Sequence, residues 1–127
     1  MSDKSVAQKL LIKEGYKVHI LNAPAGYLAS IGELPPKVMV LTKPESGTNL
    51  IQVFLKSRKE METQLPQLKQ SLKPGGLLWV TYPKGTSKMP SDINRDIIAA
   101  YARTIGMVGV TMVAVNDTWS ALRLKVG

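Results

Sequence analysis

The sequence predicts an α/β fold in three layers, in which a mostly parallel sheet of about six strands carries helices on both faces and ends in a C-terminal antiparallel hairpin. Apolar runs typical of buried strands alternate along the chain with segments of helical spacing. A helix end, a tight turn and a strand follow one another directly in Leu72-Lys73-Pro74-Gly75-Gly76-Leu77-Leu78-Trp79-Val80-Thr81-Tyr82-Pro83. Strands that alternate with helices favour parallel sheets with right-handed crossovers, and two β-rich runs at the end of the chain add the hairpin.

The first half of the chain predicts two brief helices and three strands. These are a helix at 5–13, a strand at 16–21, a helix from Pro24 to just before Gly32, and strands at 38–41 and 50–55. Gly15 is expected to stop the first helix. Pro24 suits the first turn of the second helix, because the N–H that proline lacks is unpaired there anyway. The last two strands are continuous apolar runs, as in strands covered on both faces.

The second half predicts two longer helices and three strands. These are a helix at 57–73, a strand at 77–82, a helix from Ile93 to Ile105, and strands at 108–115 and 119–126. Pro66 interrupts the first of these helices, so we expect a kink there or two short helices. Ser91 or Asp92 is the expected cap of the second. Asn116-Asp117 suits the tight turn of the hairpin.

Composition limits the classes of function. The 127 residues carry a net charge of +8 and no cysteine, which excludes disulfides, thiolate nucleophiles and thiolate metal sites. We expect one domain over 1–127, and a cytoplasmic protein, because the polar N-terminus resembles no signal peptide and no apolar run approaches the ~20 residues of a membrane span. The positive charge attracts anions or nucleic acid. Its dispersal along the chain, without interleaved aromatic residues, weakens the nucleic-acid interpretation.

Two resemblances bear on the fold. Leu72 to Val80 and Val108 to Val126 resemble Rossmann-like domains of the S-adenosylmethionine-dependent methyltransferase type, in trimmed form. The whole chain resembles more closely the bacterial family called domain of unknown function 3052. The residues that carry this second resemblance are Asn22-Ala23-Pro24 with Gly26-Tyr27, Ser57-Arg58, Tyr82-Pro83-Lys84 and Thr118-Trp119-Ser120. That family brings no activity, so the resemblance supports the fold rather than a function.

The chain departs from the methyltransferase pattern at both usual cofactor positions. That pattern implies several glycines after the first strand, where this chain has Asn22-Ala23-Pro24-Ala25-Gly26. It also implies an acidic residue after the second strand, where the chain reads Thr42-Lys43-Pro44-Glu45. Residues 41–50 are too few for a further helix and strand, so part of the usual cofactor wall is expected to be missing. S-adenosylmethionine bound in the usual way is therefore disfavoured, and a variant binding mode stays open.

Polar residues that follow predicted strands form the candidate ligand site, because ligands of parallel sheets lie at the carboxyl ends of strands. The candidate residues are Asn22, Gly26, Ser57, Arg58, Lys84, Gly85, Thr86, Ser87, Lys88 and Trp119, and Lys56 also follows a strand. Lys84 to Lys88 is either an anion-binding loop or a solvated one. Asn22 and Ser57 either cap helices or contact the ligand. Trp119 either packs beside the sheet or lines the crevice.

Other chemistry finds little support in the sequence. His19, the only histidine, lies between apolar residues of a predicted strand, so a packing role is favoured over a catalytic base or a metal ligand. Three hypotheses of function remain. The leading one is a noncatalytic methyltransferase-like module that binds a small anionic ligand or a protein partner and needs no cofactor. The alternatives are an atypical S-adenosylmethionine-dependent methyltransferase and a weak nucleic-acid binder.

Overall fold

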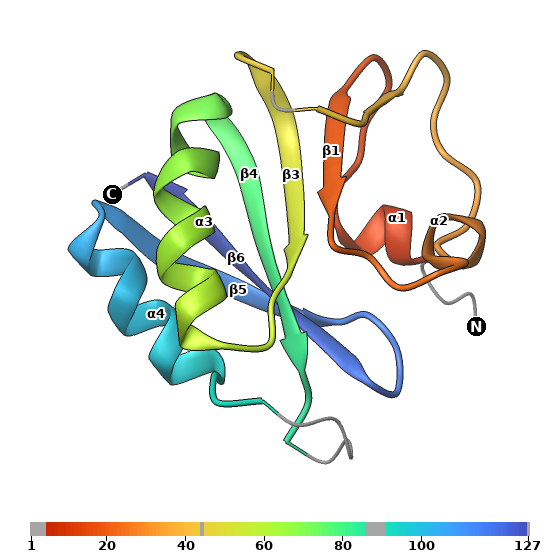
Figure 1. Ribbon diagram of the computed structural model, residues 1–127. Helices are drawn as coiled ribbons and strands as arrows, with labels where there is room; N and C mark the ends of the chain where they lie inside the picture. Colours follow the sequence, from red (N-terminus) through yellow and green to blue (C-terminus); the bar gives the residue numbers. More distant parts are fainter. Residues whose placement is uncertain (1–4, 44, 86–90, 127) are drawn as a thin grey trace.

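A single mixed sheet forms the centre of the protein. The computed structural model describes residues 5–43, 45–85 and 91–126, and its strands are β1 (Lys17–Leu21), β2 (Met39–Leu41), β3 (Thr48–Phe54), β4 (Leu72–Pro83), β5 (Met107–Ala114) and β6 (Trp119–Val126). Their order across the sheet is β2-β1-β3-β4-β6-β5 (Figure 1). Strands β1 to β4 pair in parallel, and β6 is antiparallel to both β4 and β5. The predicted fold class, including its C-terminal hairpin, is confirmed.

Helices lie on both faces of this sheet. They are α1 (Val6–Lys9), α2 (Tyr27–Ser30), α3 (Arg58–Ser71) and α4 (Arg95–Thr104). The longer helices α3 and α4 run side by side over one face in Figure 1, where their buried side chains join a core that contains Ile51 and Val53. The alternate residues of β3, Leu50 and Phe54, belong to a second core on the other face, built with α1 and α2. β3 is thus buried on both sides, as its continuous apolar run predicted.

Left-handed residues shorten both N-terminal helices. α1 ends at Lys9 rather than Lys13, because Leu10 is its C-cap and Leu11 turns the chain with a φ of 67°. The predicted start of α2 at Pro24 is also wrong. Gly26 precedes the helix with a φ of 79°, a conformation that cannot continue into a right-handed helix on either side. α2 therefore begins only at Tyr27.

α3 continues through Pro66, so the predicted pair of short helices is not what forms. Proline at 66 cannot donate the hydrogen bond that the Glu62 carbonyl would otherwise accept from the residue four positions on. The Tyr101 hydroxyl of α4 donates to that carbonyl instead, at 3.3 Å. A contact between the two helices thus satisfies the carbonyl that the proline leaves free.

We therefore expect Tyr101→Phe to lower the free energy of unfolding by about 1 kcal/mol in the native sequence. In a Pro66→Ala background the same change should cost almost nothing, because the substituted residue has a backbone N–H that bonds to the Glu62 carbonyl within the helix. A double-mutant cycle in urea measures this coupling. Equal costs in both backgrounds would show that Tyr101 does not compensate for the proline.

Side chains at the helix ends tie α3 and α4 together. Asn94, not Ser91 or Asp92, caps α4, and its Oδ1 accepts the Ile97 N–H at 2.9 Å. Asp92 acts on the other helix, where its Oδ1 accepts the N–H of Arg58 at 2.8 Å. At the far end, the Lys69 ammonium donates to the Ile105 carbonyl at 2.6 Å. Asp92 lies too far before α4 to cap it, and accepts instead an N–H of the first turn of α3.

β4 begins directly after α3. Residues 74–76, where the sequence predicts a tight turn, therefore belong to the strand. The pairing of β4 with β3 shifts register there, between Thr48 and Leu50, and Gly75 adopts a φ of 79°.

His19 lies in β1 with 4% of its surface exposed and no partner on Nδ1 among the described residues. Burial lowers the pKa of this imidazole. Within the described ranges, no helix is both long and apolar enough to cross a membrane.

Candidate ligand-binding crevice

The chain changes direction across the sheet between β1 and β3. From β1 it passes to β2 on one side, and it then returns to form β3 on the other side of β1. The connections that leave the carboxyl ends of β1 and β3 therefore diverge, and such switch points are where open α/β sheets bind ligands. The predicted site residues Asn22 and Ser57 follow these two strands.

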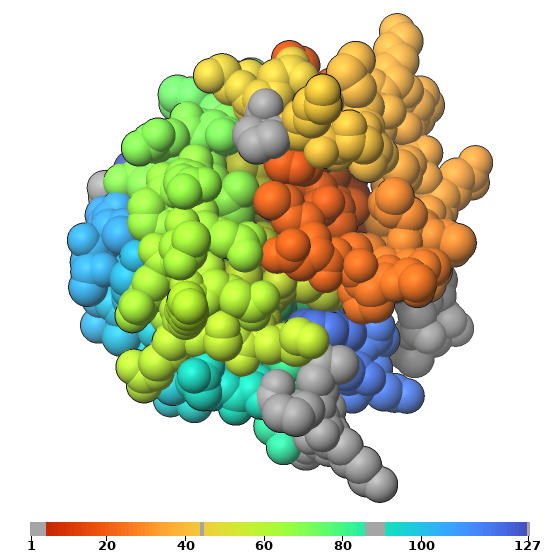
Figure 2. Space-filling model, in the orientation of Figure 1, coloured from red at the N-terminus to blue at the C-terminus, as the bar shows by residue number. Residues whose placement is uncertain are grey.

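A cavity of about 320 Å³ lies at this switch point. It is lined by Asn22, Pro24, Phe54, Lys56, Glu60 and Trp119. β6 contributes Trp119 because it runs antiparallel to β4, which pairs its first residue with Pro83 at the end of β4. In Figure 2 the orange chain after β1, the yellow-green start of α3 and the blue hairpin meet at this edge. We call this cavity the crevice.

Aromatic side chains form its apolar wall. The Phe54 ring contacts Trp119 edge-to-face with centroids 4.9 Å apart, and Tyr27 packs on Phe54 at 4.7 Å. Buried hydrogen bonds hold this row in place, because the Tyr27 hydroxyl donates to Gln52 Oε1 at 2.9 Å and Gln52 Nε2 donates to Thr81 Oγ1 at 3.0 Å. Burial raises the pKa of Tyr27 to about 12, although its bond to Gln52 opposes the rise. The wall is therefore preorganised and electrically neutral.

Two charged side chains also line the crevice. Lys56 follows β3 and is exposed, and Glu60 is half-buried in the first turn of α3. Glu60 Oε1 accepts the backbone N–H of Lys56 at 3.0 Å and the Ser57 hydroxyl at 3.4 Å. The Ser57 Oγ in turn accepts the Glu60 N–H at 3.1 Å, which confirms Ser57 as the cap of α3. The hydrogen-bonded carboxylate of Glu60 and the ammonium of Lys56 thus share one cavity.

Asn22 lines the crevice without capping a helix. The prediction that it caps a helix at Pro24 is wrong, because the N-cap of α2 is Gly26 and no side chain bonds there. Asn22 itself adopts a φ of 61°, and its Nδ2 donates to the Phe54 carbonyl at 3.3 Å and to Gln64 Oε1 at 3.1 Å. Its amide holds the chain after β1 against α3, and neither of these bonds uses Oδ1.

The other predicted site residues lie around the crevice or outside it. Arg58 lines a separate groove between α3 and α4, together with Glu62 and Tyr101. Lys84 is half-buried and its N–H bonds to the Thr118 carbonyl at 2.8 Å, while Gly85 is exposed. Thr86, Ser87 and Lys88 lie outside the described residues, so their role in anion binding stays a prediction.

Sequence reasoning missed Phe54 and Glu60. A signal for Glu60 was present, because Ser57-Arg58-Lys59-Glu60 has the serine and glutamate spacing of a capping box. Phe54 ends an apolar run, and nothing in that run distinguishes a residue that lines a cavity from one in the core.

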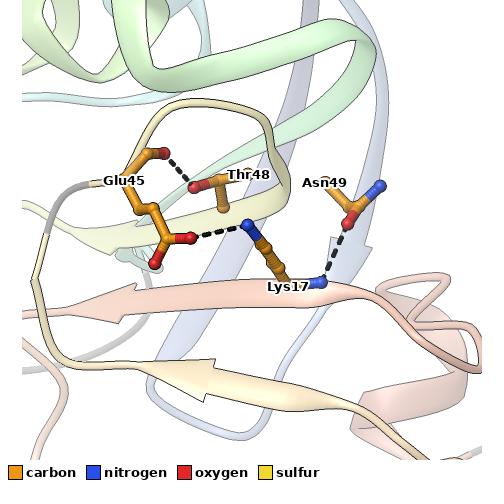
Figure 3. A network of polar contacts seen from close by, with 4 residues as sticks. All are labelled: Lys17, Glu45, Thr48 and Asn49. Carbon is orange, nitrogen blue, oxygen red and sulfur yellow. Dashed lines mark hydrogen bonds and ion pairs between the residues drawn. The ribbon is translucent and has the colours of Figure 1, made fainter.

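The acidic residue that follows β2 lies far from the crevice. Glu45 Oε1 pairs with the Lys17 ammonium at 2.5 Å, and the Glu45 carbonyl accepts the Thr48 hydroxyl at 2.5 Å (Figure 3). In the same network the Lys17 N–H bonds to Asn49 Oδ1 at 2.8 Å. Lys17 and Thr48 are the first residues of β1 and β3, so Glu45 lies at the amino ends of the strands. The crevice lies at their carboxyl ends.

Among the solved structures of similar shape are S-adenosylmethionine-dependent methyltransferases. One is an S-adenosylmethionine-dependent methyltransferase from Aquifex aeolicus, with a TM-score of 0.65, 16% identity and coverage of 98% of this chain and 91% of that chain. The DhpI–SAH complex has a TM-score of 0.67 at 9% identity, covering 98% and 83%. A TehB-like methyltransferase from Corynebacterium glutamicum has a TM-score of 0.61 at 11% identity. The match covers 98% of this chain and 89% of that chain. No protein-family model and no curated protein matches the chain, so its resemblance to domain of unknown function 3052 stays a prediction. The similarity to solved structures shows that the chain has the Rossmann-like fold of S-adenosylmethionine-dependent methyltransferases.

Proposed function

We propose that this protein is a noncatalytic methyltransferase-like module that binds a small anionic ligand in the crevice. The observation that carries the proposal is that Lys56 lines the same cavity at the switch point of the sheet as the preorganised aromatic wall of Phe54 and Trp119. Ligand sites are typically apolar hollows with a few polar groups that fix orientation. The crevice has this composition, and its volume of about 320 Å³ suits a small molecule.

Two features argue against S-adenosylmethionine bound in the usual way. Glu45, the only acidic residue between β2 and β3, is paired with Lys17 at the opposite end of the sheet. Pro24 lines the crevice where a backbone N–H would otherwise be available to a ligand. A nucleoside would therefore lack the acidic ribose partner and one of the close backbone donors that the resemblance implies.

The second candidate is an atypical S-adenosylmethionine-dependent methyltransferase. Its support is the fold shared with the methyltransferases from Aquifex aeolicus and Corynebacterium glutamicum. Thermal unfolding with and without millimolar S-adenosylmethionine separates the candidates, because a ligand that binds only the folded state raises the melting temperature. A rise with S-adenosylmethionine and none with small carboxylates or inorganic phosphate would favour the methyltransferase.

For the leading candidate we expect Lys56→Ala to weaken the binding of small carboxylates roughly tenfold, because a charge-assisted hydrogen bond is lost. Lys125→Ala is the matched control, since it removes the same charge from the exposed end of β6 that lies away from Trp119. Isothermal titration with 3-phenylpropionate measures both variants. If the two substitutions weaken binding equally, the effect is one of net charge and the crevice is not the site.

A further inference from the structure

The negative charge of Glu60 is unfavourable in a site that binds only an anion. Its side chain lines the same cavity as Lys56, and a fixed carboxylate repels a second negative charge. This carboxylate is held in place by the Lys56 N–H and the Ser57 hydroxyl. The crevice therefore presents one charge of each sign rather than a positive patch.

The unused part of this carboxylate is able to bind a cation. Among the described residues, both hydrogen bonds to the Glu60 side chain go to Oε1, and Oε2 accepts none. A ligand ammonium that bonded to Oε2 would gain a charge-assisted hydrogen bond without disturbing the cap of α3. The Lys56 ammonium, on a flexible stem, bonds to no acceptor in the described part of the chain and can bind a ligand carboxylate.

We propose that the crevice binds the zwitterion of an α-amino acid with an aromatic or large apolar side chain. This inference rests on the function proposed above, because the carboxylate of the ligand binds Lys56, and it adds an ammonium group that Glu60 binds. Lys56 binds the carboxylate, Glu60 binds the ammonium, and the side chain packs on the wall formed by Phe54 and Trp119. The small volume favours a free amino acid over a longer molecule, since ligand pockets span roughly 300 to 1,000 Å³ and this one is at the lower limit.

Three compounds that share a phenyl ring and an ethyl chain test the charge requirement. L-phenylalanine carries both charges, 3-phenylpropionate carries only the carboxylate, and 2-phenylethylamine carries only the ammonium. By isothermal titration, L-phenylalanine should bind roughly tenfold more tightly than either of the others. The tightest binding by 2-phenylethylamine would contradict both this inference and the proposed function.

Glu60→Gln should change the affinities of two of these compounds in opposite directions. It should weaken L-phenylalanine roughly tenfold and strengthen 3-phenylpropionate, because both the ammonium partner and the repulsion of the anion are lost. Glutamine keeps an Oε1 acceptor for the cap of α3, and opposite changes cannot come from partial unfolding. Glu62→Gln, the same change in the separate groove on α3, should alter neither affinity by more than about twofold.

The outcomes separate this inference from the function on which it rests. If the wild type binds 3-phenylpropionate as tightly as L-phenylalanine, and Glu60→Gln strengthens both, the zwitterion is wrong and an anion site remains. If no carboxylate binds at all, the proposed function is wrong as well.

Discussion

Gly76→Ala should lower the free energy of unfolding by about 3 kcal/mol. An added Cβ at this position would lie 2.8 Å from the Lys73 carbonyl oxygen and 2.9 Å from the Asn49 carbonyl oxygen. It would also lie 2.9 Å from Leu72 Cδ1, which can move aside, whereas the two backbone oxygens are held by the chain. The substitution would push β4 away from β3 where the register of the pair shifts. Chemical denaturation measures the loss.

Gly85→Ala is the matched control for this prediction. A Cβ at Gly85 would meet no heavy atom within 4 Å in the described part of the chain, and its φ lies outside the left-handed range. We expect its effect to stay within about 0.5 kcal/mol of zero. Equal stability of the two variants would contradict the close approach of β4 to Asn49.

Alkaline pH should destabilise the protein through Tyr27, by roughly 2 to 3 kcal/mol between pH 10 and 12. The phenol has an ordinary pKa of 10.0, which applies to the unfolded chain, and burial raises the pKa of Tyr27 to about 12 in the folded protein. Between these values the unfolded state has released its proton and the folded state has not. The stabilisation is therefore complete below pH 10 and is lost as the pH rises toward 12.

Tyr27→Phe isolates this contribution. It should cost about 1 to 2 kcal/mol at neutral pH, because the buried Gln52 Oε1 loses its donor. It should also reduce the loss of the free energy of unfolding between pH 10 and 12. Urea denaturation at successive pH values measures this slope. A variant with the same slope as the wild type would assign the alkaline loss to other groups. Burial also raises the pKa of Tyr82 and Tyr101, so a smaller slope remains.

The sequence predicted the elements whose pattern depends on burial. The continuous apolar runs at β3 and β4 indicated strands buried on both faces, and the paired runs at β5 and β6 indicated a hairpin, although most of β5 is exposed. Helix limits were less predictable. The left-handed conformations of Leu11 and Gly26 set the end of α1 and the start of α2, and at Leu11 no residue preference indicates the limit. The carbonyl that Pro66 leaves without a helical partner is bonded by Tyr101, 35 residues later in the chain, a contact that no local pattern indicates.

The candidate site was predictable in position and less so in composition. The order of the predicted strands and the turn residues between them indicated a site at the carboxyl ends of β1 and β3. They also indicated three candidate residues, Asn22, Ser57 and Trp119. Glu60 enters the crevice through the capping interaction with Ser57, and Phe54 through its place at the end of β3. The placement of Glu60 requires the packing of α3 against the sheet, whereas Phe54 belongs to the core on the other face. Arg58, next to Ser57 in sequence, lies in a different groove because successive helical residues point about 100° apart.

The most direct test of the crevice is a titration followed by the indole N–H signals in a ¹H–¹⁵N correlation spectrum. The chain has two tryptophans, so Trp119 in the crevice is the reporter and Trp79 is an internal control. Trp79 is fully buried, and its Nε1 donates to the Leu10 carbonyl at 2.9 Å. On addition of 3-phenylpropionate, the Trp119 signal should shift in a saturable way while the Trp79 signal stays in place. Saturable binding that leaves the Trp119 signal unmoved, or the absence of any shift at millimolar ligand, would contradict a ligand site in the crevice.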